Sequence, residues 1–241
     1  METLYPILVS VHGLAGAVSL LTFWMAAFAR KGGPLHRGSG KVYLLAMLGI
    51  CITAMPMAAT FFLRGQSGIG TFLAYLVVIT GTSMWLGWRA IRRKRDQAAF
   101  HDRRYAVVGA LNLVSAAVVL GVGLKIGNPL LIGFSAVGAF LGAGMLRRLW
   151  RPIDAGNWWL QEHYGAMLGC GTATHIAFFA IGLKGVLAAF GLQMSGYLQL
   201  APWAVPVLVS VIAGVLLDRR YARKPAAKPS ATVARGALPQ G

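Results

Sequence analysis

The 241-residue sequence predicts an all-α membrane protein, a bundle of seven transmembrane helices with the N-terminus outside and the C-terminus inside the cell. Three observations predict this fold class: a shortage of charged residues, long apolar runs, and an alternating distribution of basic residues. The chain is 57% hydrophobic and only 12% charged, whereas a soluble domain carries about 25% charged residues. This composition indicates that lipid is the solvent for most of the chain.

The apolar runs define the predicted helices, because a helix needs roughly 20 mostly apolar residues to cross a bilayer. Seven runs reach that length: residues 5–29, 41–63, 71–88, 105–123, 129–146, 160–183 and 200–217. The apolar stretch 186–198 is too short to cross, so we expect it to lie along the membrane surface or to cap the bundle. Residues 1–217 therefore form the predicted membrane domain, and residues 218–241, rich in Ala, Pro and basic side chains, form a disordered cytoplasmic tail.

Basic residues gather in every second connector. Of the 23 Lys and Arg residues, all but Arg64, Lys125 and Lys184 follow the first, third, fifth or seventh run. Because short loops rich in Lys and Arg stay on the cytoplasmic side, this pattern predicts an outside N-terminus and a bacterial inner membrane location. The net charge of +17 is then a topology signal that also attracts anionic lipid head groups, and we expect no nucleic-acid partner.

Small residues recur at four-residue spacing in two of the runs. Gly138 and Gly142 do so in the fifth run, and Gly165 and Gly169 do so in the sixth. Such rows let helix backbones approach closely, since lipid gives helices no hydrophobic drive to associate. We expect both rows to lie at contacts between helices.

Two histidines fall inside apolar runs. His12 lies seven residues after Tyr5, and His175 lies seven residues before Gly182. Each is therefore predicted roughly 10 Å below the outer boundary of the bilayer. Ionisable groups at that depth usually face the interior of the bundle, so the two imidazoles meet if the first and sixth helices are neighbours.

The sequence leaves the role of these histidines open between two readings. In the first reading, each histidine donates a hydrogen bond to a neighbouring helix. Alternatively, His12 and His175 share a site, either as the axial ligands of a haem b iron or as contacts of a quinone or metal ion. A second pairing, of His163 with His36 or His101, is less favoured because we place His36 and His101 on cytoplasmic loops.

Two other polar features lie on the cytoplasmic side. Glu162, at the start of the sixth run, suits the positive end of a helix dipole, and we expect it there or paired with Arg147, Arg148 or Arg151. The Gly-rich connector 31–41 carries Lys31, Arg37 and Lys41. Backbone amides and these cations could hold an anion such as a lipid head group.

The stretch "RKGGPLHRGSGKVYLLAM" resembles the first cytoplasmic loop of a family of bacterial predicted membrane proteins of unknown function. In that family Lys-Gly is followed by His-Arg and then by Gly, which Lys31, Gly32, His36, Arg37 and Gly40 match. "EHYGAML…THIAFF" is similar to a late helix of the family, and "FHDRRYA" resembles the run before its fourth helix. The resemblance implies residence in the membrane and no established reaction.

The most specific function that these observations suggest is that of a membrane redox protein with a histidine-lined haem b or quinone site near the outer leaflet. The alternatives are a non-catalytic membrane assembly or partner protein, and a transporter of protons or small solutes built around Pro56 in the second run. The sequence identifies no catalytic residues, and whether the chain is an enzyme stays open.

Overall fold

The computed structural model describes residues 4–192 and 201–221. All regular elements within these two ranges are helical: α1 (Leu4–Phe28), α2 (Pro34–Leu63), α3 (Ser67–Arg92), α4 (Gln97–Phe100), α5 (Arg103–Ile126), α6 (Pro129–Trp150), α7 (Trp158–Ala177), the π-helical turn η1 (Phe178–Gly182), α8 (Leu183–Ala189) and α9 (Ala201–Tyr221). In these ranges seven helical segments are long and apolar enough to cross a membrane. The prediction of an all-helical chain with seven such segments is confirmed.

Asn, Gly and Pro residues set several of the helix ends. Asn128 caps α6 by accepting hydrogen bonds from the amides of Leu130 at 3.0 Å and Leu131 at 3.3 Å. Gly127 ends α5 in the left-handed conformation, with φ of 64°. Pro34 follows the cap residue Gly33 and starts α2 seven residues before the predicted residue 41. His36 consequently lies in the first turns of a helix, not on a loop as predicted.

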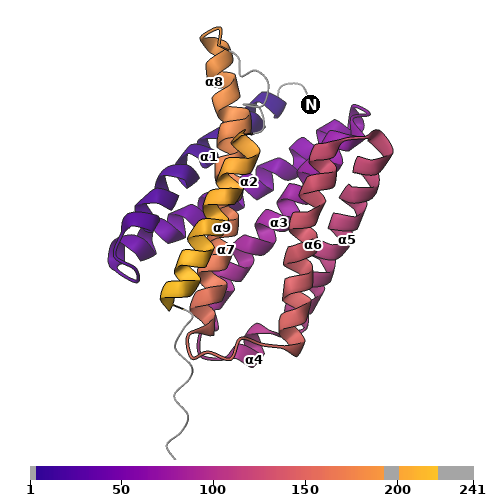
Figure 1. Ribbon diagram of the computed structural model, residues 1–241. Coiled ribbons are helices and arrows are strands. Elements are labelled where there is room, and N and C mark those ends of the chain that lie inside the picture. The colour runs from indigo at the N-terminus through magenta and orange to yellow at the C-terminus, as the bar shows by residue number, and fades with distance from the viewer. Residues whose placement is uncertain (1–3, 193–200, 222–241) are drawn as a thin grey trace, which may run out of the picture.

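The sixth predicted span is longer than the sequence suggested. Helix α7 continues through η1 into α8, so that one helical rod runs over Trp158–Ala189. Figure 1 shows α8 rising in line with α7 above the neighbouring helices. Residues 186–189 of the predicted surface stretch 186–198 therefore continue this rod and do not form a separate surface helix or cap, and residues 193–198 lie outside the described residues. Of the predicted tail, residues 218–221 belong to α9, and residues 222–241 are likewise outside them.

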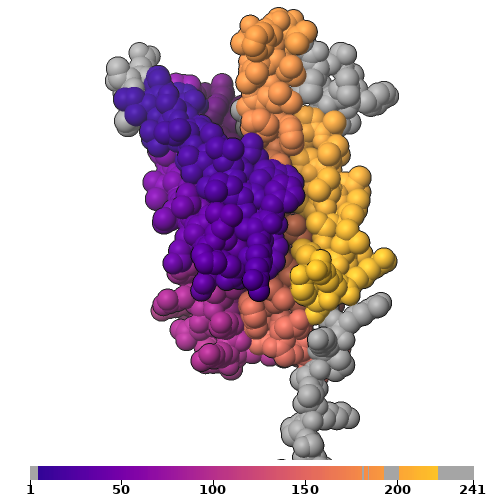
Figure 2. Space-filling model, turned by 90° about the vertical axis from the view of Figure 1, so that its left-hand side faces the viewer, coloured from indigo at the N-terminus to yellow at the C-terminus, as the bar shows by residue number. Residues whose placement is uncertain are grey.

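Helix α3 lies at the centre of the bundle, where it contacts α2, α5 and α7. The hairpin of α1 and α2 packs on one side of α3, and the hairpin of α5 and α6 packs on the other (Figure 1). Helix α9 covers one flank of α7, while a strip of α7 stays visible at the surface between α1 and α9 (Figure 2). Helix α7 thus contacts both the interior and the lipid-facing side of the molecule.

The basic connectors lie toward one end of the bundle, the lower end in Figure 1. There the chain passes from α1 to α2, from α3 through α4 to α5, and from α6 to α7, and α9 reaches its last described residues. We call this end, which carries Arg30, Lys31, Arg92, Arg93, Lys94, Arg95, Arg103, Arg104, Arg147, Arg148, Arg151, Arg219 and Arg220, the basic end.

The predicted glycine rows behave differently in the two helices. A Cβ at Gly142 would lie 2.6 Å from the carbonyl oxygen of Gly109, and one at Gly138 would lie 2.8 Å from Tyr75 Oη. Helices α5 and α6 therefore pack backbone to backbone at Gly142, as expected for a small-residue contact. A Cβ at Gly169 would meet Ser83, whereas a Cβ at Gly165 would meet nothing within 4 Å. The prediction is thus wrong for Gly165.

Candidate histidine site

His12 forms a bond between helices. Its Nδ1 lies 2.9 Å from Thr53 Oγ1 on α2. The Thr53 hydroxyl itself donates to the carbonyl of Gly49 at 2.8 Å, so the imidazole is the donor in its contact with Thr53. This is the first of the two readings that the sequence left open, a hydrogen bond that links α1 to α2.

His175 lies in an aromatic environment. Its Nδ1 donates to the carbonyl of Gly171, one turn earlier on α7, at 2.7 Å. The ring centre lies 5.3 Å from that of Phe23, 5.4 Å from that of Trp24 and 6.3 Å from that of Phe179. The other ring nitrogen, Nε2, is buried and has no hydrogen-bond partner among the described residues.

The structure does not bring His12 and His175 together, contrary to the predicted pairing. Trp24, which contacts His175, follows His12 by 12 residues on the same helix, a distance of roughly 18 Å along the axis. The prediction counted depth from Gly182, but the helical rod continues to Ala189. His175 is therefore deeper in the bundle than expected, level with the basic-end half of α1.

His36 and His163 do come together, at the basic end. Their ring centres are 6.4 Å apart and their planes are inclined by 80°. His36 lies near the start of α2 and His163 near the start of α7. The pair that the sequence ranked second is thus the one in which two imidazoles are neighbours.

Two backbone carbonyls fix the orientation of this pair. His36 Nδ1 donates to the carbonyl of Ala26 on α1 at 2.9 Å, and His163 Nδ1 donates to the carbonyl of Gly87 on α3 at 3.0 Å. A carbonyl oxygen can only accept, so each Nδ1 carries a proton when the ring is neutral. Each Nε2 then has a free lone pair, which is the arrangement typical of metal-binding histidines.

Open space and positive charge adjoin the pair. A Cβ placed at Gly40, one helical turn after His36 and on the same face of α2, would meet nothing within 4 Å. Lys31 folds back onto the carbonyls of Ala26 and Ala27 at the end of α1 and lies within electrostatic reach of His163. Partial burial lowers the pKa of the Lys31 ammonium.

The predicted anion site is only partly assembled. The Lys31 ammonium is engaged by the last carbonyls of α1, as expected of a lysine near a helix C-terminus. Arg37 and Lys41 are exposed on α2, four residues apart and therefore on one face of the helix. These two residues, rather than all three, carry cationic groups that no other described residue engages.

His101 and Glu162 belong to a separate buried polar cluster. Glu162 is 3% exposed and forms an ion pair with Arg148 of α6 at 2.5 Å, which agrees with one of the three partners expected. The His101 ring packs 4.8 Å from that of Tyr105 and 6.2 Å from that of Trp158. His101 therefore does not pair with His163. The buried atoms His101 Nε2 and Tyr105 Oη have no hydrogen-bond partner in the described chain.

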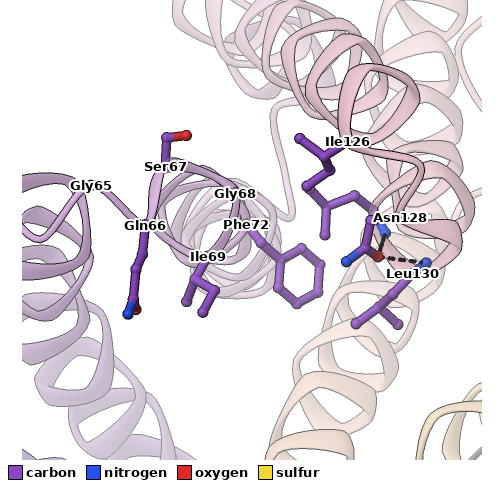
Figure 3. A pocket seen from close by; sticks show the side chains of 10 residues that line it. Gly65, Gln66, Ser67, Gly68, Ile69, Phe72, Ile126, Asn128 and Leu130 are labelled. Carbon is purple, nitrogen blue, oxygen red and sulfur yellow. Dashed lines mark hydrogen bonds between the residues drawn. The ribbon is translucent and has the colours of Figure 1, made fainter.

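A hollow at the opposite end is distant from the histidine pair. It measures about 380 Å³ and lies between the α2–α3 and α5–α6 turns (Figure 3). Phe72, Ile126 and Leu130 line it, and Asn128 turns its side-chain oxygen back to cap α6. The lining is mainly apolar, and the side-chain oxygen of Asn128 already accepts hydrogen bonds from backbone amides of α6.

The residues that complete the histidine environment were missed by sequence reasoning. Phe23, Trp24 and the carbonyls of Ala26 and Gly87 carry no pattern that would mark them, because their role depends on which helices are neighbours. Among the described residues no group of three or more His, Cys, Asp or Glu side chains is placed to hold a metal ion. Any metal here would need ligands beyond the two imidazoles.

Comparisons with known protein families, with curated proteins and with solved structures give no match in any of the three. The resemblance to a family of bacterial membrane proteins therefore stays a prediction.

Proposed function

We propose that this chain is a multi-pass membrane redox protein that binds one haem b between His36 and His163. The observation that carries the proposal is the 6.4 Å between the ring centres of these residues. Two imidazoles bound to one metal, each through a nitrogen at roughly 2 Å, have their ring centres about 6 Å apart. His36 and His163 would therefore be able to hold one metal between them, and His12 and His175 do not have this relation.

The ligand set favours haem over a free metal ion. Two side chains are too few for a protein site that holds a bare transition metal, whereas the haem macrocycle supplies the other four nitrogens. When bound, a haem b would supply reversible one-electron transfer. The chain's own contribution is to hold both Nδ1 protons on the carbonyls of Ala26 and Gly87, which keeps each Nε2 available and raises its basicity.

The surroundings of the pair also suit a flat, anionic group. Gly40, one helical turn after His36, leaves space on the face of α2 that carries this imidazole. Arg37 and Lys41, which are exposed, follow His36 on α2. Basic side chains of this kind pair favourably with the carboxylates that a haem carries at its edge.

The positions of the basic residues support a direction in the membrane. Because Lys and Arg in short loops stay in the cytoplasm, the basic end faces inward, with the N-terminus outside and the C-terminus inside. The membrane is then the bacterial inner membrane, and the histidine pair lies near its cytoplasmic surface. The earlier expectation of an outer-leaflet site depended on His12 and His175 and is replaced.

The test is a reduced-minus-oxidised visible spectrum of the protein purified from haem-sufficient cells. We expect the paired bands of a low-spin haem b at close to one haem per chain. His36→Ala and His163→Ala should each lower haem content at least tenfold, because one axial ligand is lost. His12→Ala, whose imidazole is bonded to Thr53, is the matched control and should keep the bands.

Folding must be checked in each variant. Size-exclusion elution and helical circular dichroism should match those of the unmodified chain. His36→Met offers a further variant, because a thioether can also bind haem iron, and we expect it to retain haem with a raised midpoint potential. A folded, haem-free protein from haem-sufficient cells would contradict the proposal.

A further inference from the structure

His175 retains an unused hydrogen-bond acceptor inside the bundle. Its Nδ1 proton is donated to the carbonyl of Gly171 at 2.7 Å, so a neutral ring carries its lone pair on Nε2. That atom is buried and meets no donor among the described residues. Buried polar atoms nearly always have a partner, so this nitrogen is an acceptor available to a ligand.

Aromatic rings surround this acceptor on two helices. Phe23 and Trp24 meet His175 edge to face, at interplanar angles of 74° and 90°, and Phe179 lies across it at 38°. A Cβ at Gly171 would overlap the Phe23 ring. The Phe23 ring can therefore pack here only because Gly171 has no side chain. We call His175, Phe23, Trp24 and Phe179 the aromatic site.

Part of the aromatic site lies at the surface of the bundle. Trp24 is 42% exposed, and so is Phe178, whose ring centre lies 5.2 Å from that of Phe179. Figure 2 shows α7 at the surface between α1 and α9. The π-helical turn η1 begins three residues after His175, and such turns frequently occur at functional sites.

We propose that the aromatic site binds the quinol form of a lipid-soluble quinone. One quinol hydroxyl donates to His175 Nε2, and the ligand ring packs against Phe23 and Trp24. The oxidised quinone has only acceptors and cannot make that bond. The inference names a ligand class for the proposed redox protein, and in this respect it rests on the proposed function. The binding itself needs no haem.

The test compares decylubiquinol with decylubiquinone, both titrated anaerobically into the protein in lipid nanodiscs. We expect the quinol to bind roughly fivefold to tenfold more tightly, the ratio that one net hydrogen bond provides. His175→Phe should bring the quinol down to the affinity of the quinone. His12→Phe is the control and should keep the preference, because His12 is engaged by Thr53.

A second variant distinguishes loss of the hydrogen-bond acceptor from loss of the fold. His175→Gln supplies an amide oxygen as acceptor and should restore part of the preference. Quinone affinity, which does not use the acceptor, should be the same in His175→Phe as in the unmodified chain.

Equal affinity for quinol and quinone in the unmodified chain, or a preference that survives in His175→Phe, would overturn the inference. The titrations are made on haem-free and haem-loaded preparations alike. Missing haem bands with an intact quinol preference would contradict only the proposed function.

Discussion

Glu162 and His163 are adjacent on α7, yet they belong to two different regions of the basic end. Successive helical residues point about 100° apart. Glu162 faces α6, where it is buried against Arg148. His163 faces α2 and α3, where it meets His36 and donates to the carbonyl of Gly87. One face of α7 therefore holds a buried ion pair, and the next holds two imidazoles with free lone pairs.

The Glu162 and His163 regions differ in whether their polar groups already have partners. A buried carboxylate needs its counter-ion, and removal of one partner of such a pair is strongly destabilising. An imidazole whose Nδ1 is satisfied by a carbonyl can be neutral, so its Nε2 is left for another use. We therefore expect the Glu162 region to control stability and the His163 region to control ligand binding.

The largest expected effect is on the Glu162 side. Arg148→Ala leaves Glu162, which is 3% exposed, without its cation and should lower the free energy of unfolding by about 3–5 kcal/mol. Thermal unfolding in detergent, followed by circular dichroism, measures the change. Arg147→Ala removes an exposed neighbour and should change stability by less than about 0.5 kcal/mol. If Arg148→Ala and Arg147→Ala lowered stability equally, the Glu162 region would not control stability as expected.

An intermediate effect is expected on the His163 side when haem is supplied. A ligand that binds only the folded state stabilises it by about 2.7 kcal/mol at a hundredfold excess over its dissociation constant. Haem should raise the apparent stability of the unmodified chain by that amount and leave His163→Ala unchanged. In Arg148→Ala the haem-dependent increase should persist, since that substitution lies on the other face of α7. A stabilisation by haem that His163→Ala retains would place the haem elsewhere.

The smallest effect is expected for His12, because its imidazole is already bonded to Thr53 and belongs to neither region. Its bond to Thr53 should have a coupling energy of about 0.6 kcal/mol, the average for interhelical hydrogen bonds in a membrane. A double-mutant cycle of His12→Phe and Thr53→Val measures this coupling. Haem content should be the same in all members of the cycle. A coupling of several kcal/mol, or loss of haem, would give His12 a role that its contacts do not suggest.

Composition and apolar run length were sufficient to predict the spans, because they report directly on the solvent of each segment. Spacing predicted the close contact at Gly142, where a Cβ would lie 2.6 Å from the carbonyl oxygen of Gly109. The same spacing was wrong for Gly165, which faces open space. A row of small residues allows a second helix to approach closely. Whether a helix does so depends on how the bundle is arranged.

The histidine site was harder to predict because it depends on helix ends and on neighbours. Pro34 starts α2 before His36, which converts a supposed loop residue into a fixed helical one. The extension of α7 through η1 and α8 displaced His175 from the level of His12. Neither the carbonyl of Gly87 nor the ring of Phe23 can be assigned to a histidine until the packing of α3, α7 and α1 is known.

The continuous rod Trp158–Ala189 has a consequence for experiments on intact cells. Its 32 residues span roughly 48 Å, well beyond the hydrocarbon thickness of about 30 Å. Unless the rod is steeply tilted, α8 stands clear of the bilayer on the side away from the basic end. An epitope tag joined to Phe190, the exposed residue that follows α8, should then be stained on unbroken spheroplasts. One antibody would thereby reveal the sidedness of the whole molecule.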